Sequence, residues 1–353
     1  MFKQFTIEAP LSAIEAELQQ KIDGKTKPLG ALGELENIAF QLGRIQQTST
    51  PNVSNAKMVV FASDHGVVAQ GISLFPQEVT PEMVMNFLMG GAAVSVFCEQ
   101  HHVPLRVVDV GVNALLDEHP LLGDRKVAFA SKDFSQEAAM SAEQVAQSIQ
   151  AGVDEVDLAI NNGVNLLMFG EMGIGNTCVS SCMMTALIGV SATDSTGRGT
   201  GLDSAGVSHK AQIIERSLRR AELATGQVMS EWSAQTLAEQ VGGFEILAMA
   251  GAMLQSAQRQ TAFVVDGFIC SVALLFAQKV VPNVREYAIF AHQSNEKAHK
   301  MLLSHLSAEP ILSLDLRLGE GSGAILAYPL IKSACIFLKN MASFESAGVS
   351  DSK

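Results

Sequence analysis

The chain has 353 residues, of which 48% are hydrophobic, so it is long enough to bury a core in one large domain with an appendage or in two domains. The formal net charge of -12, with scattered lysines and arginines, argues against nucleic acid or an anionic membrane surface as a partner. The five cysteines show no C-x-x-C spacing, which predicts reduced thiols. The first segment lacks a basic region followed by an apolar core, so it is not expected to be a signal peptide, and a cytoplasmic protein is predicted.

The first part of the chain predicts two helices and then a buried strand. Residues 11–20 carry apolar side chains at helical spacing, and residues 25–36 begin as a Pro/Gly turn that leads into a second helix. The lysines of this turn either face solvent or reach an anion. Residues 57–62 are typical of a buried parallel strand, and the polar residues 63–66 follow it. Open α/β sheets bind ligands at such strand ends.

Strands and helices then alternate along the chain. Thr80 is expected at the N-cap of a helix with Pro81 at its first position, running as far as Ala93. Residues 117–132 are expected to be loose and charged, and residues 326–344 to form a long helix that packs with the N-terminal helices. Further strands are predicted at 105–111, 165–169, 262–267 and 287–291, and further helices at 141–161, 242–256 and 268–280. This alternation predicts an α/β fold with a mostly parallel sheet and helices on both faces.

Two glycine-rich loops are candidates for phosphate binding. Residues 170–177 place glycines between a predicted strand and a helix, where free backbone amides can hold an anion. A plain tight turn explains this pattern about as often, since it is neither a dinucleotide-binding GxGxxG motif nor a Walker loop. Residues 197–201, with Lys210 in the next helix, can close over the same phosphate. A mobile loop and a solvated lysine are the alternatives, but two such loops favour binding.

Carboxylates near predicted strand ends are the candidates for chemistry. Glu320 stands between small residues in the segment LGEGSGA, residues 318–324, where a ligand can approach closely. A buried glutamate there would have a raised pKa and could accept a proton; alternatively it caps the following helix. Asp64, Asp109 and Asp266 occupy strand ends, and several carboxylates in one cleft suit a reaction in which positive charge develops on a sugar.

A zinc site is a weaker alternative. His292, Glu296 and His299 are four and three residues apart, so a helix would place them on one face, but the spacing is not HExxH and no further ligand is evident. Surface or capping histidines are the common case. We therefore expect no metal and no cofactor. The chain has no GxSxG segment, so covalent acyl chemistry is not expected.

Five segments, in order along nearly the whole chain, carry a family resemblance: KPLGALG at 27–33, DHGV at 64–67, GEMGIGNT at 170–177, VDGF at 265–268 and LGEGSGA at 318–324. Together they resemble the nicotinate-nucleotide:dimethylbenzimidazole phosphoribosyltransferases of cobalamin biosynthesis. The resemblance implies transfer of the 5-phosphoribosyl group from nicotinate mononucleotide to 5,6-dimethylbenzimidazole or a related base, with inversion at C1′, giving α-ribazole 5′-phosphate and nicotinate. It also implies a homodimer with a Rossmann-like large domain, residues 31–325, and a small helical domain from residues 1–30 and 326–353.

The same resemblance implies roles for individual residues. Glu320 is the base that accepts a proton from one benzimidazole nitrogen while the other attacks C1′, and Glu171 is a second carboxylate that binds the ribose hydroxyls or supports the cation-like carbon. The residues implied to bind the phosphate end of the nucleotide are Gly173, Gly175, Asn176, Thr177, Gly199 and Lys210. Those implied to line the benzimidazole pocket are Ser73, Phe75 and Met83. A non-catalytic nucleotide sensor, using the same loops without a base, is the alternative function.

Overall fold

The computed structural model describes residues 2–350, and at its centre lies a six-stranded sheet in the order β3-β2-β1-β4-β5-β6. Every neighbouring pair of strands is parallel. The strands are β1 (Ala56–Ser63), β2 (Leu105–Gly111), β3 (Leu122–Asp124), β4 (Leu166–Met172), β5 (Ala262–Val265) and β6 (Ala288–Phe290). The expected α/β fold is confirmed. The order reverses between β1 and β4, which makes the crevice beyond their carboxyl ends the expected ligand site.

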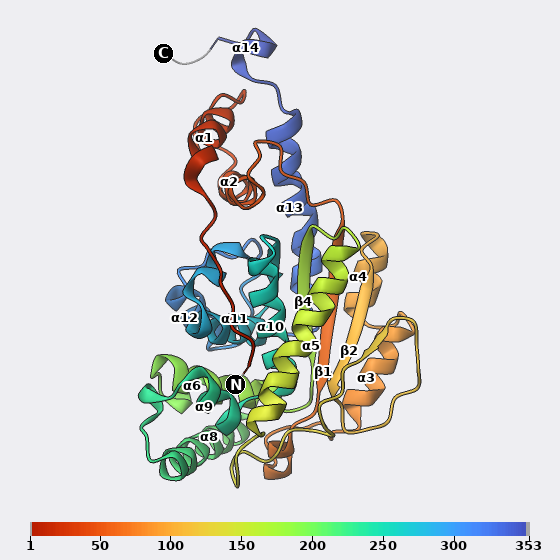
Figure 1. Cartoon of the computed structure of the whole chain (residues 1–353), viewed down its shortest axis with the longest axis vertical. Coiled ribbons are helices and arrows are strands. Elements are labelled where there is room, and N and C mark those ends of the chain that lie inside the picture. Colours follow the sequence, from red (N-terminus) through yellow and green to blue (C-terminus); the bar gives the residue numbers. More distant parts are fainter. Residues whose placement is uncertain (1, 351–353) are drawn as a thin grey trace.

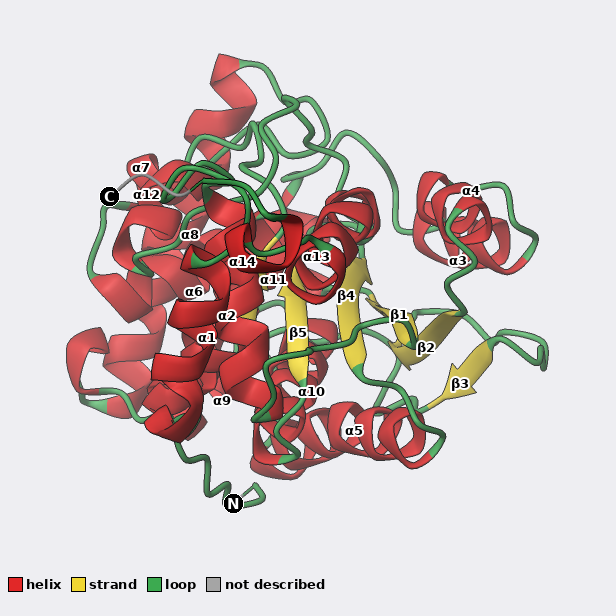
Figure 2. Cartoon of the chain, turned by 90° about the horizontal axis from the view of Figure 1, so that it is seen from above, coloured by secondary structure: helices red, strands yellow, loops and turns green. Residues whose placement is uncertain are grey.

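Helices cover both faces of the sheet (Figure 2). One face is covered by α10, which packs directly on the strands, and by α5 outside it; α3, α4 and α13 lie on the other face. Since α10 is enclosed by the sheet and by α5, it is apolar on nearly all sides. These helices are α3 (Val79–Leu88), α4 (Ala93–Gln100), α5 (Ala142–Asn161), α10 (Phe244–Gln258) and α13 (Ser322–Asn340).

The remaining helices form a group beside the sheet and a group at the chain ends (Figure 1). Beside the sheet lie α6 (Asn176–Ile188), α7 (Ala192–Ser195), α8 (Ser204–Thr225), α9 (Ala234–Val241), α11 (Phe268–Val280) and α12 (His299–His305). At the chain ends lie α1 (Glu15–Asp23), α2 (Glu34–Gln46) and α14 (Phe344–Ala347). Short 3₁₀ turns are η1 (Ser12–Ile14), η2 (Gly66–Gln70), η3 (Met229–Glu231) and η4 (Pro282–Tyr287).

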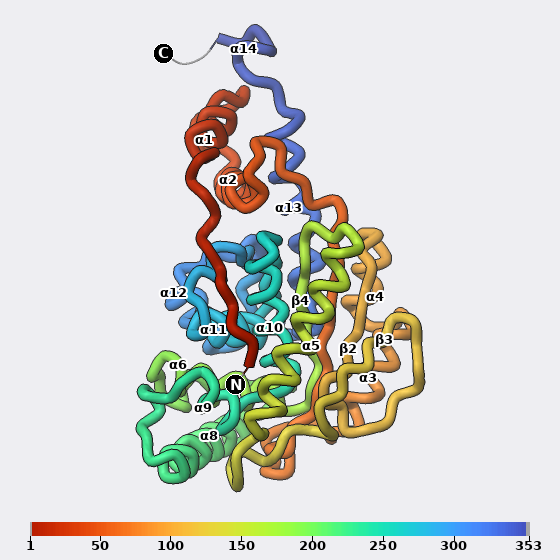
Figure 3. Tube along the Cα trace, in the orientation of Figure 1, coloured from red at the N-terminus to blue at the C-terminus, as the bar shows by residue number. Residues whose placement is uncertain are grey.

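Helices from the first and last parts of the chain lie together in one region (Figure 3). The segment before α1 runs along α10, where Lys3 Nζ donates to Gln255 Oε1 at 2.8 Å. Helix α2 packs against α1 and α13, and Lys25 pairs with Ser343 in an antiparallel bridge. The expected packing of the terminal helices is therefore confirmed. The domain boundaries at 30 and 326 stay a prediction.

The lysines of the turn before α2 neither face solvent nor line a ligand pocket. Lys25 Nζ donates to the carbonyl of Met341 at 2.6 Å, and Lys27 Nζ lies 2.9 Å from Glu36 Oε1. Both side chains are buried. Lys25 therefore joins the two ends of the chain, and Lys27 reaches an anion within the protein, the carboxylate of Glu36. The alternative in which these lysines face solvent is wrong.

The structure corrects three expected elements. The helix expected from Thr80 to Ala93 begins at Val79 and ends at Leu88, because Gly90 takes a left-handed conformation, and α4 begins separately. The Thr80 hydroxyl does not cap this helix; it accepts a hydrogen bond from Ile174 N at 3.1 Å. The loose region 117–132 contains edge strand β3, whose three residues are too few to show a pattern. The last long helix, α13, ends at Asn340 and not at 344.

Two stretches, Val79–Gln100 and Ser322–Asn340, have the length and apolar composition of a membrane span. The first is two separate helices, α3 and α4. In the second, 56% of the most apolar window is buried inside the fold, as in a core helix of a soluble protein.

Candidate active site

A cavity of about 450 Å³ lies at the carboxyl ends of β4 and β5, beside the point where the strand order reverses. It brings together most of the predicted site residues, which are Phe75, Met83, Glu171, Gly173, Asn176, Thr177, Gly199 and Glu320. Gly175, Lys210 and Ser73 do not line it. Gly175 is the N-cap of α6, and the Ser73 hydroxyl lies 3.5 Å from that of Thr200 at the cavity wall.

The glycine loop after β4 presents a helix N-terminus to the cavity. β4 ends at Met172, and α6 begins at Asn176 with Gly175 as an N-cap that makes no side-chain cap hydrogen bond. The first amides of a helix and its dipole favour an anion at this end. The predicted strand, glycine loop and helix are therefore in place, and their geometry suits a phosphate.

Lys210 supports this helix end from behind. Its side chain is only 1% exposed, and Nζ donates to Thr177 Oγ1 at 2.7 Å. Burial lowers the pKa of the ammonium, while the nearby Cys178 and Glu296 oppose the shift. Because this side chain is buried, the alternative of a solvated lysine is wrong. A buried ammonium whose hydrogen-bond partner is a hydroxyl needs a further anion nearby to offset its desolvation.

Glu320 has an unusual backbone and a free carboxylate. Its φ of 65° lies between φ values of 83° at Gly319 and 82° at Gly321, so three successive residues are left-handed. Such a conformation is uncommon for a non-glycine residue, and strained residues of this kind cluster at functional sites. The turn rests directly on β4, because a Cβ atom at Gly170 would lie 2.5 Å from the carbonyl carbon of Glu320. Only glycine at 170 permits this contact.

The Glu320 side chain is set up as a base. It is 6% exposed, and Oε2 has no hydrogen-bond partner in the part of the chain that the structure describes. Burial, and secondly the charge of Asp266, raises its pKa to about 7. The N-cap of α13 is Gly321, without a side-chain cap hydrogen bond. The alternative, in which Glu320 caps α13, is therefore wrong.

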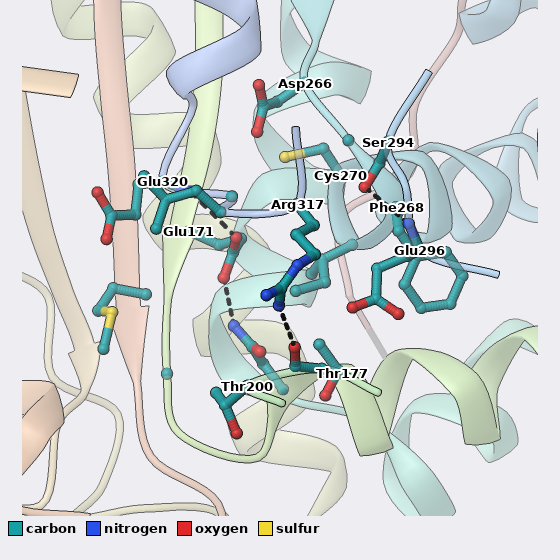
Figure 4. Close-up of a pocket in the computed structure, with 18 of the residues that line it drawn as sticks. Glu171, Thr177, Thr200, Asp266, Phe268, Cys270, Ser294, Glu296, Arg317 and Glu320 are labelled. Carbon is teal, nitrogen blue, oxygen red and sulfur yellow. Dashed lines mark hydrogen bonds between the residues drawn. The ribbon is translucent and has the colours of Figure 1, made fainter. Parts of the chain in front are cut away.

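Glu171 links the glycine loop to the turn at Glu320. Its carboxylate accepts hydrogen bonds from Asn176 Nδ2 and, at 3.3 Å, from Glu320 N. Burial raises its pKa well above the usual value, and the charges of Asp266, Glu245 and Glu320 add to this shift. Figure 4 shows Glu171, Asp266 and Glu320 around one end of the cavity, with Thr177, Glu296 and Arg317 towards the other. Asp109 lines a different cavity.

The polar residues after β1 lie beneath the loop and do not line the cavity. His65 Nε2 lies 3.0 Å from Glu245 Oε1, and both side chains are fully buried. Burial alone would lower the pKa of His65, but the Glu245 carboxylate and Asp64 raise it by more. A Cβ atom at Gly173 would lie 3.2 Å from His65 Nε2. The pair therefore supports the glycine loop from below.

The helix expected to hold zinc ligands does not form. α12 begins only at His299, so His292 and Glu296 lie in the preceding loop. His299 Nδ1 accepts from Ser294 N at 2.8 Å, and Nε2 lies 3.0 Å from Ser271 Oγ. Within residues 2–350, no three His, Cys, Asp or Glu side chains lie together as a metal site would require. The metal-dependent alternative rests on a wrong helix prediction.

Sequence reasoning missed several residues that line the cavity. Arg317 precedes the LGEGSGA segment, and its Nη1 donates to the Gly199 carbonyl at 3.5 Å. Its place three residues before Glu320 was a signal that could have found it. Phe268 and Ser294 also line the cavity. Phe268 was part of a quoted segment without a role, and nothing in the sequence distinguished Ser294.

The sheet is doubly wound and parallel, and the cavity at its carboxyl edge is lined by acids and a helix N-terminus. This arrangement defines an α/β enzyme acting on a small ligand. The model of a family described as "Phosphoribosyltransferase" matches residues 7–349. The chain belongs to the nicotinate-nucleotide–dimethylbenzimidazole phosphoribosyltransferase family.

Relatives with this name match along nearly their whole length. The protein from Cupriavidus necator is 48% identical over 348 residues, covering 98% of this chain and 99% of the relative. The protein from Aromatoleum aromaticum is 47% identical over 347 residues, with the same coverage. Among solved structures, CobT from Thermus thermophilus has a TM-score of 0.91 and 39% identity, covering 96% of this chain and 99% of that one. The predicted family is therefore confirmed.

Proposed function

We propose that this chain transfers the 5-phosphoribosyl group of nicotinate mononucleotide to 5,6-dimethylbenzimidazole, with inversion at C1′, releasing nicotinate and α-ribazole 5′-phosphate. The relatives are named for nicotinate nucleotide and dimethylbenzimidazole. The observation that carries the proposal is Glu320, a buried carboxylate with a free oxygen and a pKa of about 7, at the wall of the cavity.

Proton balance explains the need for this base. As one ring nitrogen of the benzimidazole bonds to C1′, the bond from C1′ to the nicotinate nitrogen breaks and the other ring nitrogen becomes acidic. Glu320 Oε2 has no competing hydrogen bond and accepts this proton. A base with a pKa near the working pH is ionised often enough to react and still holds the proton well. A positioned base contributes about 10²–10⁴-fold in rate.

The other end of the cavity holds the nucleotide in this proposal. The N-terminus of α6, with Gly173, Asn176 and Thr177, receives the phosphate, and Lys210 supplies charge through Thr177. Glu171 is buried with a raised pKa, so it suits hydrogen bonding to ribose hydroxyls.

The second substrate lies against apolar side chains of the cavity. Phe75 and Met83 line the cavity and form the wall for the flat base. An apolar wall does not discriminate strongly between related bases.

The test is product formation by wild type and by Glu320→Gln, with nucleotide binding measured in parallel. The variant keeps the shape of the side chain and removes the base, so we expect binding to persist and kcat to fall by about 10²–10⁴-fold. Glu99→Gln, an exposed carboxylate at the end of α4, is the control and should match wild type.

Other outcomes would overturn the proposal. Wild type that binds the nucleotide but forms no product would identify a nucleotide sensor. A Glu320→Gln variant with normal turnover would remove Glu320 from the chemistry.

The homodimer and the cytoplasmic location belong to the proposal as well. The acidic net charge of -12 is consistent with a protein that binds neither nucleic acid nor membranes. Light scattering of the purified chain measures the oligomeric state directly. A mass equal to one chain would contradict the dimer.

A further inference from the structure

The N-terminus of α13 is capped from another part of the fold. Asp266 directly follows β5 and is 2% exposed, and its Oδ1 accepts a hydrogen bond from Ala324 N at 2.8 Å. Burial raises the pKa of this carboxylate overall, although nearby His292 and the amides at the start of α13 lower it. A Cβ atom at Gly323 would lie 2.8 Å from Asp266 Oδ1. Asp266 therefore occupies the position that the side chain of a residue just before the helix would take if it capped the helix.

The residue in line to cap this helix is Glu320, which immediately precedes the N-cap residue Gly321. A carboxylate that accepts two or three backbone N–H groups becomes a very weak base, because these hydrogen bonds lower its pKa. Glu320 avoids this outcome, since its Oε2 has no partner and its left-handed turn sets it apart from the first amides of α13.

We propose that Asp266 is the positioning residue that keeps Glu320 a base: it accepts the amide of Ala324 in the first turn of α13 and places a negative charge in the wall of the same cavity as a carboxylate left without hydrogen bonds. The role of Asp266 is electrostatic and acts through Glu320. The inference rests on the proposed function, because it assigns Asp266 to tuning the base of that reaction.

The charged or titratable groups around this end of the cavity come from several elements. Glu171 from β4, Asp266 after β5 and His292 after β6 line the cavity here. Arg317, from the loop before Glu320, lines it towards the other end, and Glu245 of α10 lies beneath it.

Three of these groups are accounted for by other contacts. His292 Nε2 lies 3.7 Å from Asp266 Oδ1 and so faces Asp266. Glu245 lies beside His65, and Arg317 bonds to the Gly199 carbonyl.

Glu171 and Asp266 remain. Burial raises the pKa of Glu171 well above its usual value. Burial also raises the pKa of Asp266, while His292 and the amides at the start of α13 lower it, and in its charged form Asp266 raises the pKa of Glu320.

The experiment is the pH profile of kcat for Asp266→Asn, measured beside wild type and Glu320→Gln. Asparagine keeps the size and an acceptor oxygen for the amide of Ala324 but removes the charge. We expect the acid limb of the profile, near pH 7 in wild type, to move about one pH unit lower, and the plateau rate to fall severalfold. The KM for nicotinate mononucleotide should stay unchanged.

Matched variants separate tuning from a structural role. Asp109→Asn is the control. Asp109 lies near the end of β2 and accepts hydrogen bonds from two backbone amides, Gly111 N at 3.1 Å and Val112 N at 2.9 Å, but it lines another cavity. Asp109→Asn should lower the stability of the protein without moving the acid limb of the kcat profile. Asp266→Glu restores the charge and should return this acid limb towards its wild-type position. If Asp266→Asn does not fold, Asp266→Ser, which is neutral and has an acceptor oxygen, should show the same shift.

The outcomes distinguish this inference from the proposed function. If wild type forms no product, the proposed function fails. If wild type is active, Glu320→Gln is inactive, and a folded Asp266→Asn or Asp266→Ser keeps the acid limb of wild type, the proposed function stands and the role of Asp266 is overturned.

Discussion

Glu320 and Lys210 are buried polar groups whose hydrogen-bonding or charge requirements are not fully met within the protein. Glu320 combines a left-handed backbone with a carboxylate oxygen that lacks a partner, and both features cost stability. Lys210 is a buried cation whose only hydrogen bond in the described residues goes to a neutral hydroxyl, that of Thr177. These costs are offset if a substrate supplies the missing partners. Glu320 stands in a glycine-rich segment and Lys210 in the helix after one, but their burial could not be predicted from those segments.

Lys210→Met tests the assignment of the lysine to the phosphate end. Methionine fills the same buried volume without charge, so the loss of a charge-assisted contact of about 1.5–3 kcal/mol should raise the KM for nicotinate mononucleotide by roughly 10–100-fold. The value of kcat should change much less. Steady-state kinetics measure both, and Lys279→Met, an exposed lysine in the last turn of α11, is the control. An unchanged KM would remove Lys210 from the binding site.

The helices and strands were predictable where local signals are strong. Helix α5 begins after Ser141 as expected, because Ser141 and Gln144 form a capping box, and α11 has the predicted bounds. The sequence could not reveal contacts between distant segments. The hydrogen bond from Ala324 to Asp266 spans 58 residues, and the contact of Arg317 with Gly199 spans 118. Both contacts form between loops that come together only in the folded sheet, and the local periodicity of the sequence does not predict such long-range contacts.

The close contact of α5 and α10 gives a prediction about stability. A Cβ atom at Gly251 would collide with the carbonyl oxygen of Ile149, which is backbone and cannot rotate away. Gly251→Ala should therefore lower the free energy of unfolding by about 1–3 kcal/mol, although alanine is the better helix former. Denaturant unfolding measures this change. The control is Gly206→Ala in α8, where the added methyl meets mainly the flexible side chain of Leu202. Equal stability of both variants would contradict the tight contact.

Several buried acids lie together near the carboxyl edge of the sheet. Burial raises the pKa values of Glu171, Asp266 and Glu320 around the cavity, and also that of Asp64 below it. An acid whose pKa is higher in the folded than in the unfolded chain holds its proton better when folded. The ligand-free protein should therefore lose stability as pH rises through the range between the two values. The active site is thus arranged at the expense of the stability of the empty fold.

Glu320→Gln should make this cost visible. The ordinary pKa of glutamate is 4.5 and that of folded Glu320 is about 7, a difference that corresponds to about 3 kcal/mol of unfolding free energy. This stability is present below pH 4.5 and is lost as pH rises to about 7. Glutamine has no proton to lose, so the variant should gain on wild type by up to about 3 kcal/mol between pH 5 and pH 8.

Denaturant unfolding of ligand-free wild type and Glu320→Gln at both pH values measures the effect, with Glu99→Gln as the control that should follow wild type. A stability difference that does not change with pH would mean that Glu320 ionises in the fold as it does in water. The turn at Glu320 would then have no means of holding a base near neutral pH, and the proton in the proposed reaction would have to go to another group. A difference that grows with pH would show that the strain and burial at Glu320 maintain its basicity at the expense of the fold.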